Sequence, residues 1–298
     1  MKKILLIGST VADIIINLDH LPTTSGDVNV ISQEMSLGGC AYNVSNMIHL
    51  FDVPYRLFSP VGTGLYGDFV RNQLAVKGLA SPMPTPDQAN GCCYCFVEEG
   101  GERTFVCDHG AEYLFYKEWF DTLKMEKVSS IYICGLEIED KTGGTIVDFL
   151  EANSDIPVFF APGPRICFID RALMDRIFAL HPIVHLNEDE LCGFTGTSSL
   201  EDGAKTLYGM TRNTVIVTHG AEGAYYYDGD EFIHVPPVRA EKVVDTIGAG
   251  DSHIGTVMAC LAKGKSIYEA IKTANAVSSL VVGKKGATLS REELTITI

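Results

Sequence analysis

The sequence has little positive charge. Its 298 residues include 23 Lys and Arg against 38 Asp and Glu, a formal net charge of −15 at pH 7. This balance opposes binding to polyanions, so neither nucleic acid nor an acidic membrane surface is an expected partner. The shortage is greatest over residues 8–50, which contain no Lys or Arg but do contain Asp13, Asp19, Asp27 and Glu34. A pocket built from this segment would repel a phosphorylated ligand.

Long hydrophobic runs are absent as well. No uninterrupted stretch reaches the roughly 18 apolar residues that a membrane-spanning helix requires. The start, MKKILLIGSTVADIII, places two lysines before an apolar run, but KILLIG is typical of a buried first strand and Asp13 interrupts the run. The sequence therefore predicts neither a membrane span nor a secretory signal, and we expect a cytoplasmic protein.

The nine cysteines are odd in number, which without an export signal indicates reduced thiols rather than a disulfide framework. Cys92, Cys93, Cys95 and Cys107 lie close in sequence, with His109 nearby. Because the segment is typical of a β-hairpin, adjacent side chains point to opposite faces. Packing by small apolar thiols is therefore favoured over a zinc site.

The remaining composition, 46% hydrophobic and 20% charged, suits a globular chain with a sizeable core. Short apolar runs alternate with segments of helical spacing, which predicts a mainly parallel sheet with helices on both faces and ligand sites beyond the carboxyl ends of the strands. The expected strands are 4–7, 55–61, 131–134, 158–161, 183–186 and 215–217, and the expected helices include 41–51, 67–77, 144–151, 170–180, 250–263 and 266–283.

Two segments interrupt this alternation. Residues 12–36 have the pattern of extended strands, and residues 91–108 that of a hairpin turning at 98–102. We expect both to be insertions in one α/β domain that spans residues 1–298. A small sheet formed by them would act as a lid that shields a reactive site from water, and an ordinary edge hairpin is the alternative.

The most informative motif is VVDTIGAGDSHIGTVMACLA, residues 243–262, where an apolar strand leads through a glycine-rich turn into a helix. Gly248, Ala249 and Gly250 are small enough for backbone N–H groups to converge on an anion at the helix N-terminus. Asp251 is placed to accept the proton of an attacking hydroxyl while those groups hold the charge on a transferred phosphoryl group. A plain helix cap is the alternative.

A second glycine motif, LGGCAYN, covers residues 37–43. Gly38 and Gly39 allow a ligand to approach the backbone, and Asn43, in the first turn of the next helix, can donate to and accept from hydroxyl groups. Asp13 adds a charged acceptor for two vicinal hydroxyls. The pattern favours a polyol ligand, and a glycine turn with a capping Asn is the alternative.

Two further strand ends carry polar motifs. Asn187 and Glu190 in HLNEDEL are placed to hold waters of a magnesium ion bound to phosphates, although helix capping explains the same residues. The segment from Thr218 to Gly223 is a glycine turn suited to lie along a nucleotide. Gly62, Gly64 and Gly67 satisfy G-x-G-x-x-G, but a proline-rich loop replaces the second strand that a dinucleotide site needs.

Taken together, these motifs resemble those of the ribokinase-like, or PfkB, family of carbohydrate and nucleoside kinases, over essentially the whole chain and in the family's order. DTIGAGD at 245–251 is similar to its C-terminal signature, LGGCAYN to its substrate-side motif, and NEDE at 187–190 to its magnesium motif. The resemblance implies a three-layer α/β sandwich with a β-sheet lid. It also implies ATP-dependent phosphorylation of a primary hydroxyl on a neutral sugar or nucleoside.

The resemblance implies a role for each matching residue. Asp251 would be the general base, with Gly248, Ala249 and Gly250 as the anion hole. The acceptor would be bound by Asp13, Gly38, Gly39, Asn43 and Arg165. ATP and Mg²⁺ would be held by Asn187, Glu190, Thr218, Gly220 and Gly223, with Asn275 near the adenine and Glu190 acting on Mg²⁺ through water. Relatives often bind a monovalent cation such as K⁺, and the similar positions are Asp245, the Ile247 carbonyl, Gly286 and Ser290.

Some features keep rival functions open. His253 and Tyr42 depart from the family pattern and are expected to reshape the acceptor pocket. Arg103, Arg165 and His109 are cations that could reach the pocket, and their convergence opposite the base would indicate a phosphosugar kinase. A non-catalytic sugar or nucleotide sensor on the same fold is the other alternative. An exposed edge of the lid favours a homodimer.

Overall fold

The computed structural model describes residues 2–100 and 102–298, and an eight-stranded sheet forms its centre. The strand order is β12-β11-β10-β9-β8-β7-β1-β4. Strands β10 to β4 in this order are parallel, whereas β11 and β12 are antiparallel additions at one edge. The bounds are β1 (Lys3–Ile7), β4 (Tyr55–Phe58), β7 (Val128–Cys134), β8 (Val158–Ala161), β9 (Ile183–Asn187), β10 (Val215–Thr218), β11 (Ala224–Tyr227) and β12 (Phe232–Val235).

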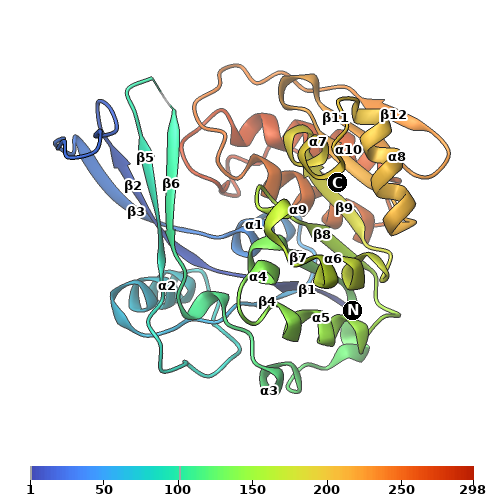
Figure 1. Cartoon of the computed structure of the whole chain (residues 1–298), viewed down its shortest axis with the longest axis horizontal. Coiled ribbons are helices and arrows are strands. Elements are labelled where there is room, and N and C mark those ends of the chain that lie inside the picture. The colour runs from blue at the N-terminus through green and yellow to red at the C-terminus, as the bar shows by residue number, and fades with distance from the viewer. Residues whose placement is uncertain (1, 101) are drawn as a thin grey trace.

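Helices cover both faces of this main sheet (Figure 1). Side chains alternate along β1, so Ile4 and Leu6 belong to one buried cluster while Leu5 and Ile7 belong to the other. The first face carries α1 (Cys40–Leu50), α2 (Gly64–Val76), α9 (Ala249–Ala262) and α10 (Ile267–Val281). The second carries α3 (Lys117–Phe120), α4 (Gly135–Glu139), α5 (Gly143–Glu151), α6 (Arg171–Phe178), α7 (Glu188–Thr195) and α8 (Leu200–Thr211).

A second, four-stranded sheet stands beside the main sheet, in the order β3-β2-β5-β6 (Figure 1). The strands are β2 (Val11–Asn17), β3 (Ser32–Gly38), β5 (Cys92–Val97) and β6 (Arg103–Asp108). We call it the small sheet. Its register sets Asp13 opposite Cys93, and Cys93 opposite Cys107. Because β2 follows the end of β1 after three residues, the small sheet begins at the carboxyl edge of the main sheet.

The predicted α/β class with a separate small sheet is confirmed, and the boundaries differ locally. β4 ends at Phe58 rather than at residue 61, next to Pro60, which has no N–H to donate. The helix expected from residue 67 begins at Gly64, after Thr63 in extended conformation. The apolar segment before the 248–250 turn is a loop rather than a strand, held by N–H groups of Val244 and Asp245 on the Val282 carbonyl.

No helix within the described ranges 2–100 and 102–298 is long and apolar enough to cross a membrane.

Candidate active site

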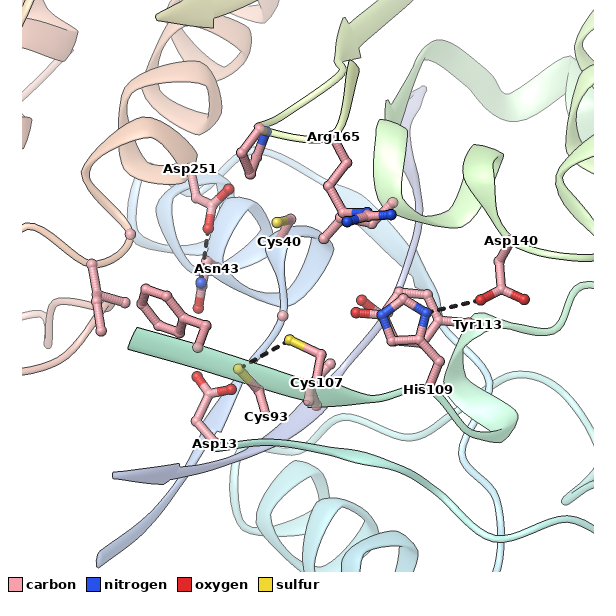
Figure 2. Close-up of a pocket in the computed structure, with 18 of the residues that line it drawn as sticks. Asp13, Cys40, Asn43, Cys93, Cys107, His109, Tyr113, Asp140, Arg165 and Asp251 are labelled. Atoms are coloured by element: carbon pink, nitrogen blue, oxygen red, sulfur yellow. Dashed lines mark hydrogen bonds and ion pairs between the residues drawn. The ribbon is translucent and has the colours of Figure 1, made fainter. Parts of the chain in front are cut away.

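A pocket of about 880 Å³ opens between the carboxyl edge of the main sheet and the small sheet (Figure 2). Its walls come from β2, the start of α1, the facing side chains of β5 and β6, α4 with the loop after β8, and the turn before α9. Seven of the residues to which the family resemblance assigns a role line it: Asp13, Gly39, Asn43, Arg165, Ile247, Gly248 and Asp251. The topology therefore brings together motifs that lie more than 200 positions apart in the sequence.

Asp251 lies in the first turn of α9, and its side chain points into this pocket. The Asn43 side-chain amide, from the first turn of α1, donates a hydrogen bond of 2.8 Å to Oδ2 of Asp251 (Figure 2). Burial raises the pKa of Asp251 to about 6, and the Asn43 hydrogen bond opposes part of that rise. A carboxylate with this pKa is ionised at neutral pH and is well matched to general-base chemistry.

The turn before α9 depends on glycine. Gly248 is the N-cap of the helix at φ 73°, and a Cβ there would lie 2.5 Å from the Ala287 Cβ and 2.6 Å from its carbonyl oxygen. Only glycine adopts this conformation without strain and without collision. The first turn of a helix leaves N–H donors unpaired, and here it begins beside Asp251 at the pocket wall. The arrangement can hold an anion next to a carboxylate.

The two glycines of the substrate-side motif have different local roles. Gly39 lines the pocket as the N-cap of α1 at φ 96°, and a Cβ there would lie 2.6 Å from the Ser9 carbonyl oxygen. Gly38 belongs to β3 and makes room for Asp13, since a Cβ would overlap that carboxylate at 1.9 Å. Burial raises the pKa of Asp13 to about 7, and the nearby charges of Cys107 and Asp251 add to this effect.

Two cysteines in the pocket were missed as site residues. Cys93 and Cys107 face each other across β5 and β6, with their sulfur atoms 3.4 Å apart (Figure 2). Cys92 and Cys95 are buried. The hydrogen bond with Cys93 lowers the pKa of Cys107 to about 6. The prediction of apolar packing is thus wrong for Cys93 and Cys107. Alternation along the strand separates Cys93 from Cys92, but only the register of the small sheet places Cys93 beside Asp13.

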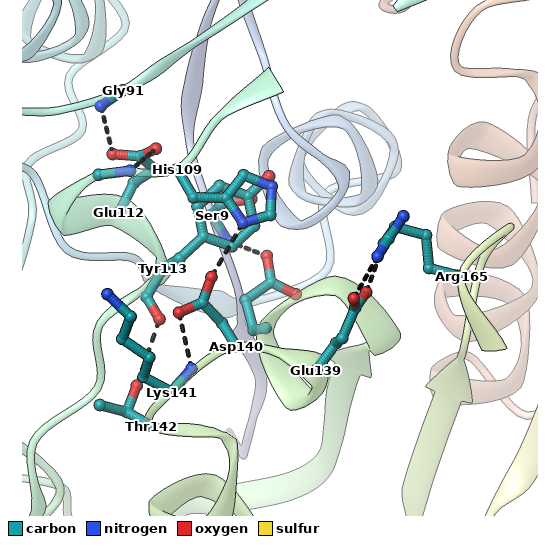
Figure 3. Close-up of polar contacts among 12 residues, drawn as sticks. Ser9, Gly91, His109, Glu112, Tyr113, Glu139, Asp140, Lys141, Thr142 and Arg165 are labelled. Carbon is teal, nitrogen blue, oxygen red and sulfur yellow. Dashed lines mark hydrogen bonds and ion pairs between the residues drawn. The ribbon is translucent and has the colours of Figure 1, made fainter. Parts of the chain in front are cut away.

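The end of the pocket away from the glycine turn carries paired charges (Figure 3). Arg165 binds Glu139 through Nε and Nη2, with 2.5 Å between Nε and Oε2. His109 lies 2.9 Å from Asp140 through Nδ1 and stacks on Tyr113 at 3.8 Å between ring centroids. Neither Glu139 nor Asp140 was singled out from the sequence, because nothing local marks the long-range partner of a cation.

Asn187 and Glu190 form a reciprocal cap at the start of α7. The Asn187 Oδ1 accepts from the Glu190 N–H at 2.8 Å, and the Glu190 carboxylate accepts from the Asn187 N–H at 3.0 Å. Burial raises the pKa of Glu190, and the negative charges of Asp189 and Asp251 add to it. The pair thus caps the helix and also keeps oxygen atoms in the electrostatic range of Asp251, a donor set that suits Mg²⁺ through water.

Neighbouring backbone completes this edge. Thr218, the last residue of β10, pairs with Asn187 in the parallel register, and Gly220 and Gly223 follow with φ of 49° and 91°. A Cβ at Gly223 would lie 2.5 Å from the Val235 carbonyl oxygen, so this turn packs closely on β12. Asn275 lies behind it, where its amide donates to the carbonyl oxygens of Val235 and Pro236 at 3.0 Å each.

His253 and Tyr42 do not reshape the pocket, contrary to the expectation from sequence. Both are buried and neither lines the pocket. His253 lies between His185, at 2.9 Å from ring nitrogen to ring nitrogen, and the Asn275 oxygen at 3.2 Å. It therefore joins α9 to β9 and α10 beneath the site.

Asp245, expected among the ligands of a monovalent cation, already has a cationic partner. Asp245 accepts hydrogen bonds from the N–H groups of Ile247 at 2.8 Å and Gly286 at 2.9 Å. The same carboxylate forms an ion pair with Arg103 of β6. The Ser290 hydroxyl accepts from the Glu293 N–H. The Arg103 guanidinium therefore already supplies a positive charge to the Asp245 carboxylate.

The chain was compared with known proteins. The model of the pfkB family carbohydrate kinases matches residues 1–294. An uncharacterized sugar kinase of Escherichia coli, YegV, is 34% identical over 98% of this chain and 93% of its own length. Among solved structures, a ribokinase of Thermotoga maritima superposes with a TM-score of 0.85 at 22% identity, covering 98% of both chains. A Burkholderia thailandensis nucleoside kinase in complex with inosine gives 0.78 at 20% identity, covering 97% of this chain and 94% of its own.

The fold and this sequence match define a kinase of sugars or nucleosides. The chain belongs to the pfkB family of carbohydrate kinases.

Proposed function

We propose that the protein transfers the γ-phosphoryl group of ATP to a primary hydroxyl of a neutral sugar or nucleoside, with Asp251 as general base. One observation carries the proposal: a half-buried carboxylate, held by Asn43, meets the N-terminus of α9 at the wall of the pocket. The carboxylate would take the hydroxyl proton. The backbone of Gly248, Ala249 and Gly250 would hold the charge on the phosphoryl group in flight.

ATP and Mg²⁺ would approach from the side of β9 and β10. Asn187 and Glu190 would hold the ion through water, and the backbone from Thr218 to Gly223 would lie along the nucleotide, with Asn275 supporting the wall nearest the adenine. Solved relatives support this, since an Arabidopsis thaliana ribokinase is complexed with ribose and ATP and an E. coli putative ribokinase II with ATP and Mg²⁺. The metal supplies charge neutralisation to the phosphates. K⁺ is not part of the proposal, because Arg103 occupies Asp245.

The pairing of charges in the pocket supports a neutral acceptor. Both basic side chains among the described lining residues have acidic partners, Arg165 on Glu139 and His109 on Asp140. Asp13 and Asp251 face the same space without a cationic partner in the described structure. A phosphorylated acceptor would meet net negative charge, whereas vicinal hydroxyls can donate to Asp13.

The acceptor class is testable by an ADP-release screen across neutral sugars, nucleosides and phosphosugars. We expect turnover on at least one neutral acceptor and none of comparable kcat/KM on its phosphorylated counterpart. Glu139→Gln removes the charged partner of Arg165. This variant should reduce the difference in kcat/KM between the neutral acceptor and its phosphorylated counterpart. Preference for a phosphosugar by the unmodified protein would favour the phosphosugar kinase. Binding of a sugar without turnover on any acceptor would favour the sensor.

The small sheet would act as the lid of this site and as a dimer interface. Its outer strands β3 and β6 have unpaired edges, and apolar side chains are exposed on and beside them, including Ile31 and Val106 at 68% and 53%. A second copy covering these edges would remove both the open backbone groups and the apolar surface. Sedimentation velocity should give a dimer, and Val106→Lys should shift it toward monomer. A monomeric unmodified protein at micromolar concentration would contradict this part.

A further inference from the structure

One ion pair joins the small sheet to the loop that carries the anion-hole turn. Arg103, at the start of β6, reaches Asp245, three residues before Gly248. Both side chains are largely shielded, with exposed fractions of 16% for Arg103 and 4% for Asp245. Figure 1 shows β6 on the side of the small sheet that faces the loop leading from β12 to α9. The contact therefore bridges two parts of the chain 142 positions apart.

Asp245 organises that loop through backbone hydrogen bonds. Its Oδ1 accepts from the Ile247 N–H, at the pocket wall, and its Oδ2 accepts from the Gly286 N–H. Gly286 lies one residue before Ala287, the residue against which Gly248 packs. The carboxylate thus holds both loop segments that shape the glycine turn, one at Ile247 and the other at Gly286. Its only charged partner among the described residues is Arg103.

We propose that Arg103 is a tethered cation that replaces a free monovalent ion at the anion-hole loop. This inference rests on the proposed function, because it assigns the small sheet a part in completing the site. When the small sheet covers the pocket, the guanidinium neutralises Asp245 and the carboxylate holds the Ile247 and Gly286 N–H groups in place. Closure over the acceptor and ordering of the phosphoryl-binding turn are then one event, and the kinase needs no added K⁺.

The chemistry of the pair suits this role. A guanidinium is charged at every working pH and loses its hydration more readily than an ammonium group, so it can serve in a shielded place. Removing it leaves a buried carboxylate without a counter-charge, which is costly. A small cation from solution could then enter beside Asp245. A small cation should therefore restore part of what is lost when the Arg103 guanidinium is removed. A contact with a purely structural role would not be restored in this way.

The test compares the unmodified protein with Arg103→Met in potassium chloride and in tetramethylammonium chloride, at matched concentrations up to about 100 mM so that screening is equal. Two readouts are taken: kcat, and the melting temperature without ATP or acceptor. The unmodified protein should respond equally to both salts. Arg103→Met should have a kcat lower by about tenfold or more and a lower melting temperature. K⁺, but not tetramethylammonium, should restore part of both.

Two further variants complete the test. Arg103→Met combined with Asp245→Asn should show no K⁺ response, and Arg171→Met, an exposed arginine of α6, should behave as the unmodified protein. Selective activation of the unmodified protein by K⁺ overturns the inference, as does Arg103→Met without a K⁺ response. If Arg103→Met does not fold, Arg103→Lys is tested in its place. Because Lys retains the positive charge, the kcat and melting temperature of this variant should not depend on K⁺. The melting temperature can be measured even if no acceptor is phosphorylated. Failure of the proposed function can therefore be distinguished from failure of this inference.

Discussion

Asp251→Asn is expected to lower kcat by about 10²- to 10⁴-fold, the usual contribution of a general base. The amide has nearly the shape of the carboxylate but cannot take up the hydroxyl proton, so acceptor binding should change less than kcat. With the pKa of Asp251 raised to about 6, activity of the unmodified protein should fall as the pH is lowered through that value, because a protonated carboxyl is no longer a base. Initial rates of ADP release between pH 5 and 8 measure both effects.

The loss should not come from misfolding. Replacing a buried ionised carboxylate by a neutral amide removes a desolvation cost, so the melting temperature of Asp251→Asn should equal or exceed that of the unmodified protein. Asp175→Asn, which alters an exposed carboxylate on α6, is the matched control and should keep full activity. A kcat for Asp251→Asn within tenfold of the control would remove the base assignment.

Gly248→Ala should have the second largest effect. The residue is held at φ 73°, and its new Cβ would lie 2.5 Å from the Ala287 Cβ and 2.7 Å from the Ala287 Cα, so the turn must move. We expect a loss of about 1–3 kcal/mol of unfolding free energy from strain and overpacking. A displaced anion hole should lower kcat by about 10²- to 10³-fold. Denaturant titration and single-acceptor kinetics measure the two losses separately.

Gly264→Ala separates backbone strain from displacement of the turn. Gly264 follows α9 at φ 82°, but a Cβ added there would meet nothing within 4 Å. Gly264→Ala should lower the free energy of unfolding only through the strain of a positive φ, and its kcat should be normal. Equal kcat values in the two variants would mean that the 248–250 backbone does not hold the reacting phosphoryl group.

The elements of the main sheet were predictable because their signals are local. A buried parallel strand is a short apolar run, and an amphipathic helix repeats every 3.6 residues, so β1, β7, β8, β9 and β10 were all expected close to their observed positions. The glycine turn was equally visible, because Gly248, Ala249 and Gly250 stand together directly before a segment of helical spacing. Sequence also indicated that Asp13, Asn43 and Asp251 lie together, through the carboxyl-edge rule and the resemblance of their motifs.

The partners of these residues could not be predicted. Arg165 was expected at the acceptor, but its neutralisation by Glu139 depends on how α4 meets the loop after β8. The pairing of Cys93 with Cys107 depends on the register of a hairpin whose turn could shift by one residue and reverse both faces. Arg103 and Asp245 approach only after the small sheet folds over the main one. Each is a long-range contact that no periodicity encodes.

The buried link of His185, His253 and Asn275 has a consequence for acid tolerance. Burial lowers the pKa of His253 to about 4 and that of His185 well below its ordinary value. In the unfolded chain both imidazoles have a pKa of about 6.5. Below that pH the unfolded chain binds protons at His185 and His253 that the native protein does not bind. His185 and His253 therefore lower the free energy of unfolding as the pH falls below about 6.5, and this loss grows until the pH reaches their pKa in the native protein. Acidification below about pH 6.5 should thus protonate Asp251 and weaken the scaffold over overlapping pH ranges, and a melting curve at each pH separates the two effects.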